Sequence, residues 1–537
     1  MKNLDPKISS EELNLYSQIS SKERALITLI TIIGTFMAIL DTTIVEIIIP
    51  KLTGPLSTDL YGVQWVVISY MLSAAITLLF VIHLAVLIGY KYVFISGVFL
   101  FTVASFFCGN ANSLAEMIIA RSVQGIGEAF IVSSAQVILF FTYPLEKRGT
   151  AMGIYGLGVS FAPALGPTLG GFLTEHFSWR WVFFINVPIG ILLFFGSLFF
   201  LPSIKIFKKF KFNFISYLFI SIGTICLLIM LSKGQQYGWF QSTFIITLFF
   251  ISIIAFLLYF LSELLSKEPL INFSIYKIPE FGLSMGLHFF LLGFGMYQVF
   301  YLFPLYFENL KGLTTLQTGF HILGFALTVG IFSIISGIIS DKISPYLVLS
   351  LSLLIFIFTT YFILPQINYY TPSLKAALYP IPLGIAIGCF FAPLSTISLK
   401  KLGKETGLGV VLMQYKRFIG GSFGTAIATN HLQFNLNKHY LKINELQNHY
   451  VVENFLSEKT NLFNQFFSLD LAEKKAKALL YKAQYIQALS WAFQDTFKQI
   501  TVWGIVGGIF LIILLLKVYL QAPFSGSQTP LLKSFSK

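Results

Sequence analysis

Charged side chains inside apolar stretches are the residues of this sequence best suited to chemistry. Asp41 and Glu46 lie in the apolar stretch 25–49. A charge at the centre of a bilayer costs about 2.5–3.5 kcal/mol on insertion scales, so each one needs a physical reason. Asp41 could carry a proton, or it could be a structural carboxylate bonded to Thr42, Thr43 or a neighbouring helix. The two acids stand about 140° apart around a helix and cannot face one cavity equally, and Glu46 suits a hydrated outer rim.

A second group of polar side chains follows one face of the apolar stretch 114–141. Arg121, Gln124 and Glu128 have the spacing i, i+3, i+7 that places them in line on a helix. Arg121 is always charged, so it must bind a carboxylate or line water. A glutamate in apolar surroundings favours its neutral form, so Glu128 could take up and release a proton. Glu128 could instead be a structural partner of another helix.

Basic residues and histidines of the second half give weaker indications. Lys416 and Arg417 are adjacent, so they cannot share one helix face, and we expect one of them to snorkel to the membrane surface. His288 and His321 lie singly in apolar stretches. A lone histidine there is more typical of a packing hydrogen bond than of a proton relay.

Glycine and proline interrupt the apolar stretch 150–173. Gly166 and Gly170 lie four residues apart, on one helix face where they would let a neighbour approach closely. Pro163 and Pro167 each remove a backbone donor and bend the helix, which requires neighbours that satisfy the freed carbonyls. Together with Gly171, the pattern favours a kinked helix at an interface that slides or rocks; the alternative is a small-residue packing face in some other polytopic protein.

The composition requires a membrane. Of 537 residues, 56% are hydrophobic and 11% charged, with a mean hydropathy of +0.78, more apolar surface than a soluble domain of this length can bury. The sequence therefore predicts an all-α polytopic membrane protein. We place its fourteen spans near residues 25–49, 63–82, 92–109, 114–141, 150–173, 181–201, 212–231, 242–265, 281–307, 315–339, 346–364, 374–399, 406–429 and 499–520.

The basic residues indicate the topology. The net charge is +13, and Lys and Arg gather in alternate connections, which places those connections and both termini in the cytoplasm. The scatter of these residues among loops argues against nucleic-acid binding. The three cysteines offer neither a disulfide framework nor a metal site. No nucleophile–base pair or phosphate loop stands in any connection, so we expect no enzyme.

One connection, 431–498, is much longer than the others and lies outside by parity. Residues from about 470 to 500 predict a strong helix, with Asp470 as its cap and Glu473 completing a capping box. The helix has an apolar side and a lysine-rich side. It could lie on the outer membrane surface or form a docking surface for a partner.

Several motifs jointly resemble those of fourteen-span drug:proton antiporters of the EmrB/QacA type, within the major facilitator superfamily. The resemblance covers about residues 25–430 and the last span. The motifs that carry it occupy residues 40–50, 121–127, 156–171, 179–190 and 417–424, the last including Arg417.

The resemblance implies a major facilitator fold that works by alternating access around a midplane site. It implies two six-helix bundles, two inserted spans and energy from a proton gradient, without a cofactor or metal. The expected divisions are a cytoplasmic segment 1–24, a bundle 25–201, inserted spans 202–265, a bundle 266–520 that contains the 431–498 connection, and a cytoplasmic tail 521–537.

The sequence departs from this family at its cytoplasmic gate. In the loop between spans two and three only Gly89 and Lys91 match the family pattern, and Val86 stands where the acid belongs. The equivalent loop between spans ten and eleven keeps all three expected residues, Gly337, Asp341 and Lys342. In addition, Glu46 replaces a usual asparagine and Glu128 a usual small residue. The usual gate mechanics are therefore in doubt.

We interpret the chain as an inner-membrane exporter of amphipathic, cationic small molecules in exchange for protons. The alternative is an exporter dedicated to one metabolite, siderophore or lipid-like molecule, and a remoter one is a non-transporting sensor on a transporter fold. Besides its substrate and membrane lipid, analogy with the subfamily suggests a periplasmic membrane-fusion adaptor and an outer-membrane channel as partners.

Overall fold

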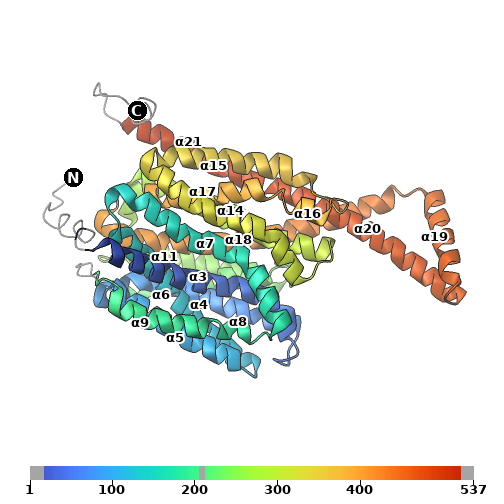
Figure 1. The fold of residues 1–537 in the computed structure, drawn as a ribbon, viewed down its shortest axis with the longest axis horizontal. Helices are drawn as coiled ribbons and strands as arrows, with labels where there is room; N and C mark the ends of the chain where they lie inside the picture. Colours follow the sequence, from blue (N-terminus) through green and yellow to red (C-terminus); the bar gives the residue numbers. More distant parts are fainter. Residues whose placement is uncertain (1–16, 18, 205–211, 522–537) are drawn as a thin grey trace.

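The computed structural model describes residue 17, residues 19–204 and residues 212–521. Within these residues every regular element is a helix, so the predicted all-α class is confirmed. Most helices lie roughly parallel to the long axis of the molecule (Figure 1). Residues 1–16, 205–211 and 522–537, which hold most of the predicted cytoplasmic segment 1–24 and tail 521–537, lie outside the described part.

The first helices have polar caps at the predicted ends of apolar stretches. Ser20 and Glu23 form a capping box at the start of the first helix, and the Asp59 and Ser113 side chains accept backbone N–H bonds at the starts of two others, which satisfies orphan donors there. The helices are α3 (Ser21–Leu52), α4 (Leu60–Ile88), α5 (Tyr90–Asn110), α6 (Leu114–Thr142), α7 (Arg148–His176), α8 (Trp181–Phe184) and α9 (Asn186–Phe200).

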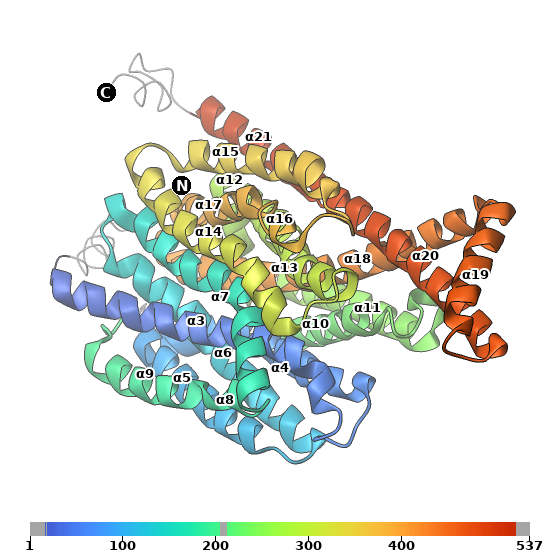
Figure 2. The same cartoon turned by 45° about the vertical axis from the view of Figure 1, so that its right-hand side comes forward.

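Two helices, α10 (Phe214–Lys233) and α11 (Thr243–Leu265), follow at the positions of the predicted inserted spans. α10 packs on α11, on α4 and on α18, so it touches helices from both sides of the insertion (Figure 2).

The second set of helices is less regular, because three of its segments, η4, η5 and η6, are wider π-type turns. The elements are α12 (Pro279–Leu287), η4 (His288–Gly295), α13 (Met296–Leu305), η5 (Tyr306–Leu310), α14 (Thr315–Lys342), α15 (Pro345–Phe358), η6 (Thr359–Ile363), η7 (Leu364–Gln366), α16 (Ser373–Ala376), α17 (Ile381–Leu399), α18 (Thr406–Glu445), α19 (His449–Asn464), α20 (Leu469–Gln499) and α21 (Thr501–Gln521).

The count of fourteen spans is not confirmed. Among the described residues, twelve helices are long and apolar enough to cross a membrane, or thirteen if one bent pair counts as a single span. The helix that contains the predicted thirteenth span, α18, is not among them, since Gln414, Lys416 and Arg417 interrupt its apolar stretch.

The bent pair consists of the 3-10 turn η1 (Leu145–Lys147) together with α7, and its two parts, Leu145–Pro163 and Leu165–His176, meet at 48°. The bend follows Pro163, as the proline pattern predicts. The α7 glycines face two different neighbours: a Cβ on Gly166 would lie 2.4 Å from Thr43 Oγ1 of α3, whereas a Cβ on Gly171 would lie 2.8 Å from Leu316 Cα of α14. The Gly166 and Gly170 face thus packs on α3, and Gly171 belongs to the α7–α14 contact.

α7 and α14 pack closely at both ends of their contact. At one end a Cβ on Gly319 would lie 2.3 Å from Thr168 Cα. At the other end a Cβ on Gly153 would lie 2.6 Å from the Ser333 carbonyl oxygen, and a Cβ on Gly337 would lie 2.3 Å from the Gly149 carbonyl oxygen. Glycines on both helices, which carry no side chain, therefore allow the two backbones to approach almost to contact along this seam.

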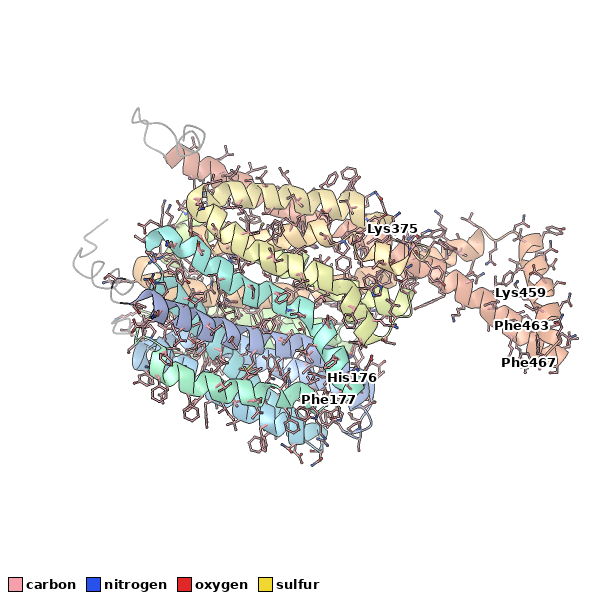
Figure 3. All side chains as sticks on the ribbon, viewed as in Figure 1. His176, Phe177, Lys375, Lys459, Phe463 and Phe467 are labelled. Atoms are coloured by element: carbon pink, nitrogen blue, oxygen red, sulfur yellow. The ribbon has the colours of Figure 1, made fainter. Side chains whose placement is uncertain are left out.

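The predicted connection 431–498 is a helical hairpin rather than an irregular loop. α18 continues without a break to Glu445, α19 turns across its end, and α20 returns along α18. The hairpin projects beyond the other helices along the long axis, with Lys459, Phe463 and Phe467 at its tip (Figures 1 and 3). α20 thus runs along the bundle axis. A helix on the membrane surface would instead lie across that axis.

The predicted helix from about 470 to 500 is confirmed as α20, but its predicted cap is wrong. Ser468 occupies the cap position, and Asp470 lies in the first turn, where its carboxylate accepts a hydrogen bond of 2.7 Å from Lys474 Nζ. An acid in the first turn also suits the helix dipole. The predicted cap, Asp470, thus lies two residues after the observed one.

The α7–α14 seam gives a test with a matched control on one helix. Gly319→Ala should lower Tm by several degrees, because its Cβ meets backbone that must move, and overpacking costs about 1–3 kcal/mol. Gly324→Ala meets nothing within 4 Å and should leave Tm unchanged or slightly higher, since alanine favours a helix. Equal Tm values for the two variants would contradict the close packing.

Candidate functional site

A buried polar network lies among the first helices, around the Asp41 carboxylate of α3. Arg121 of α6 forms an ion pair with Asp41 Oδ2. Gln124 Nε2 and Asn186 Nδ2 donate to Asp41 Oδ1 at 2.9 and 2.8 Å. Gln124 Nε2 also donates to Ser105 Oγ at 2.8 Å. Helices α3, α5, α6 and α9 therefore meet at one carboxylate, which is 1% exposed.

Arg121 is itself held from several sides. Its Nη1 also donates to Gln124 Oε1 at 2.7 Å and its Nε to the Val66 carbonyl oxygen at 3.2 Å, while its guanidinium lies 3.9 Å from the centre of the Tyr70 ring. An ion pair, hydrogen bonds and a cation–π contact thus offset a charge that is 0% exposed, while its Nη2 has no hydrogen-bond partner among the described residues. The Asp41 carboxylate thus bonds to side chains of neighbouring helices rather than to Thr42 or Thr43.

Glu128, two turns further along α6, stands in a different environment. It is 6% exposed, and its Oε2 has no hydrogen-bond partner among the described residues. It lines a cavity of about 550 Å³. A buried carboxylate oxygen without a partner is costly, so this side chain is available for a ligand or a proton in a way that Asp41 is not.

The cavity lies between the early and the late helices. α3, α4, α6 and α7 line it on one side and α13, η5 and α18 on the other, while the end of α10 also reaches it. Its charged lining residues among the described part are Glu128, Glu308 and Arg417, and its other walls are mainly apolar and aromatic. Such a lining suits an amphipathic molecule.

Arg417 is held at the cavity wall by two neighbours. Its Nε donates to Gln414 Oε1 at 3.0 Å and its Nη1 to the Tyr297 hydroxyl at 3.2 Å. The adjacent Lys416 turns away, with its Nζ 4.8 Å from the centre of the Tyr276 ring. The expectation that the two charges do not share one face is therefore confirmed.

Beyond Arg417 a hydrogen-bonded chain joins late and early helices. Gln414 Nε2 of α18 donates to Gln136 Oε1 of α6 at 2.6 Å and to the Tyr155 hydroxyl of α7 at 3.1 Å. Tyr155 in turn donates to the Val132 carbonyl oxygen at 2.9 Å. On α18, the residues that line the cavity begin at Arg417. Gln414 precedes them, so the hydrogen-bonded chain through Gln414 lies at the inner end of the cavity.

Two of the three predicted gate residues of the late half, Gly337 and Asp341, contact α7 directly. The Asp341 carboxylate accepts the backbone N–H groups of Gly149 and Thr150 at 2.7 and 2.6 Å and the Thr150 hydroxyl at 2.6 Å. It thus caps the first turn of α7, where a negative charge also suits the helix dipole. Gly337 packs against Gly149 beside it, and Lys342 is exposed.

At the corresponding position between α4 and α5, Gly89 adopts a left-handed φ of 88° and ends α4 with a backbone bond to Ala85. Glycine accepts this conformation readily. Lys91 is half-buried at the start of α5. The side chain of Glu46 lies outside the described part of the structure. His288 is buried, with its Nδ1 at 2.9 Å from the Ser284 carbonyl oxygen, and His321 pairs similarly with Gln317.

Sequence reasoning missed several polar residues at the site. Glu308 lines the cavity from η5, but in sequence it stands just past a predicted span and resembles a loop residue. Gln136 and Gln414 carry no charge, so only their position within apolar stretches could have signalled them. Glu280, buried at the start of α12, pairs with Lys401 of a connection, a contact that no local spacing predicts.

The Asp41 network predicts a large loss of stability on removal of one charge. Asp41→Asn leaves the buried Arg121 guanidinium without its counter-charge, and we expect a loss of about 3–5 kcal/mol in the free energy of unfolding. Asp41→Asn combined with Arg121→Gln should recover part of that loss. Chemical or thermal unfolding of the purified variants measures both. A single variant as stable as the wild type would refute the compensation.

Comparisons with known proteins agree with this architecture. The family model of the Major Facilitator Superfamily matches residues 31–425. The multidrug export protein EmrB of Haemophilus influenzae is 31% identical over 412 residues, which cover 75% of this chain and 79% of that protein. The uncharacterized MFS-type transporter YhcA of Bacillus subtilis is 27% identical over 501 residues, covering 92% and 93% of the two chains.

A solved structure shares the fold at low sequence identity. The crystal structure of a bacterial homologue of the human lysosomal transporter Spinster, in an inward-facing and unoccupied conformation, covers 95% of this chain and 100% of its own, with a TM-score of 0.54 and 16% identity. The family model spans most of the sequence, and the observed helices fit the fold. The chain therefore belongs to the Major Facilitator Superfamily.

Proposed function

We propose that this protein exports amphipathic, cationic small molecules across the inner membrane in exchange for protons. The observation that carries the proposal is Glu128, a buried carboxyl with an unpartnered oxygen at the wall of an apolar, aromatic cavity. An ionised carboxylate in such a cavity attracts a lipophilic cation, because little water screens its charge. The multidrug export named for the similar EmrB supports the proposal.

Cargo and proton compete for Glu128 in this mechanism. The ionised carboxylate binds the cation of the cargo. Proton uptake neutralises it and removes the attraction, and the fixed charge of Arg417 at the same wall then repels the cargo. One site serves both ligands in turn, so the protein needs no cofactor and no chemical step on the cargo.

Access to the cavity changes as the late helices move against α7. The bonds from Asp341 to Gly149 and Thr150, together with the Gln414–Gln136 bond, join the two sets of helices at one end of the cavity. The basic connections mark this end as cytoplasmic. Opening toward the cytoplasm breaks these bonds, while the tight outer contact of Gly171 with Leu316 closes the other end.

The moving bodies are the two bundles, 25–201 and 266–520, with the inserted spans 202–265 between them. Both termini face the cytoplasm in this topology. The multidrug names of the relatives do not favour an exporter dedicated to a single compound.

Glu128→Gln tests the shared site. The amide cannot ionise, so we expect loss of proton-coupled efflux while the protein stays folded. Transport of ethidium into inside-out vesicles with an imposed pH gradient measures this, and Glu116→Gln at an exposed position of the same helix is the control. Full transport by Glu128→Gln would remove this carboxyl from the mechanism.

We further propose that the α18–α20 hairpin binds a periplasmic adaptor of the membrane-fusion type, which passes cargo to an outer-membrane channel. The proposal rests on analogy with the subfamily and on the projecting hairpin (Figure 3). Its α19 and neighbouring turns expose large apolar side chains, namely Tyr450, Val451, Leu462, Phe466 and Leu469, as protein interfaces do.

Replacing residues 446–468 with a short flexible linker tests this role. Transport in inside-out vesicles should persist, because the cavity lining does not include these residues, whereas resistance of whole cells should fall. The substitution Lys375→Ala, at an exposed position outside the hairpin, should affect neither. Equal loss in vesicles and cells would show that the hairpin is needed for the fold instead.

A further inference from the structure

The outer end of the cavity contains an aromatic side chain on a strained backbone. Trp239 follows α10 and has a φ of 54°, directly after Gly238 with a φ of 70°. Left-handed φ values are rare for bulky residues, cost about 1–3 kcal/mol and cluster at ligand-binding positions. Trp239 also lines the cavity, so the strained residue contributes its ring to the space where cargo would pass.

Three contacts fix the position of this ring. Trp239 Nε1 donates to Gln235 Oε1 at 3.0 Å, and the Trp239 backbone N–H donates to the Gly234 carbonyl oxygen at 2.8 Å. The indole packs so closely on Gly234 that a Cβ there would lie 2.6 Å from the ring. The ring is therefore preorganised, which reduces the entropy lost when a ligand binds.

α10 is itself anchored to the early helices at this end. Lys233 is 3% exposed, and its Nζ donates to the Tyr61 carbonyl oxygen at 2.8 Å and to Gln64 Oε1 at 2.9 Å, both at the start of α4. These bonds hold the end of an inserted helix against the cavity. The insertion thus supplies part of the cavity wall, with Leu231, Ser232 and Gln235 beside the indole.

A carboxylate lines the same cavity from the late helices. Glu308 is half-buried in η5, the turn that ends α13. Tyr306 in that turn packs on Phe493 of α20, with ring centres 5.6 Å apart, which places η5 at the projecting end of the molecule. Glu128 lines the cavity from the middle of α6, so the two acids belong to different depths of one space.

We propose that Trp239, Gln235 and Glu308 form a second, outer subsite that receives the cationic end of the cargo after it leaves Glu128. This inference rests on the proposed function and names a binding site on its release path. An aromatic face and a carboxylate together attract a lipophilic cation through cation–π and Coulomb forces. An uncharged molecule of similar size gains only apolar contact, so the outer subsite selects for positive charge.

Transport kinetics of Glu308→Gln and Trp239→Ala test the subsite. In proteoliposomes we expect each variant to raise KM for ethidium, a permanent aromatic cation, by about fivefold to tenfold, as a loss of about 1 kcal/mol implies. The Kd of the uncharged dye Nile red, measured by fluorescence on binding to the purified variants because the proposed exchange carries only cations, should change less than about twofold, which is below about 0.5 kcal/mol. Glu268→Gln and Trp181→Ala, both exposed and outside the cavity lining, are matched controls, and Tm of each variant shows whether it folds.

The outcomes separate this inference from the function on which it rests. A wild type that does not move ethidium with a pH gradient contradicts the proposed function and the subsite with it. A wild type that exports ethidium, with both variants folded and unchanged in KM, overturns the subsite alone. An equal weakening of ethidium transport, as a rise in KM, and of Nile red binding, as a rise in Kd, also overturns it, because it would show a loss of shape rather than of a charge-selective contact.

Discussion

The cost of an uncompensated charge in an apolar interior determines most of this structure. The carboxylate of Asp41 is matched by Arg121, Gln124 and Asn186, and this buried network ties α3, α5, α6 and α9 together. Two turns further along α6, Glu128 has an unpartnered oxygen and faces the cavity. The early helices thus carry one acid, on α3, whose charge is balanced by the fold and one, on α6, whose charge is left for a ligand or a proton.

The early and late helices meet in two different ways, by close packing along the α7–α14 seam and across an open cavity. Along the α7–α14 seam, glycines and serines bring backbones together, and the Asp341 carboxylate caps α7 from the other side. The distances in these contacts are short, but few atoms take part. A modest movement of the helices can therefore break all of them at once. In the cavity, by contrast, the helices stand apart and present aromatic rings, two acids and one arginine. Close approach at the seam and an open space beside it are what alternating access requires.

The sequence predicted much of this arrangement because hydropathy and helical spacing are local signals. It placed Arg121, Gln124 and Glu128 on one face and predicted the bend at Pro163, and its family resemblance is confirmed. It could not say which acid has a partner, because Asn186 and Asp41 are distant in sequence and meet only in the fold. Uncharged residues such as Gln136 and Gln414 gave no signal, and Glu308 looked like a loop residue. The extension of α18 to Glu445 was missed because its polar sequence predicts no span.

The central claim is that cargo and a proton compete for one buried carboxyl. Proton release on cargo binding tests it most directly: purified protein in weakly buffered detergent is mixed with ethidium while a pH indicator is followed. By linkage, binding should release up to about one proton per cargo molecule where Glu128 is protonated beforehand, and Glu128→Gln should release none. Ethidium binding by the wild type without any proton release, from mildly acidic to mildly alkaline pH, would contradict the account.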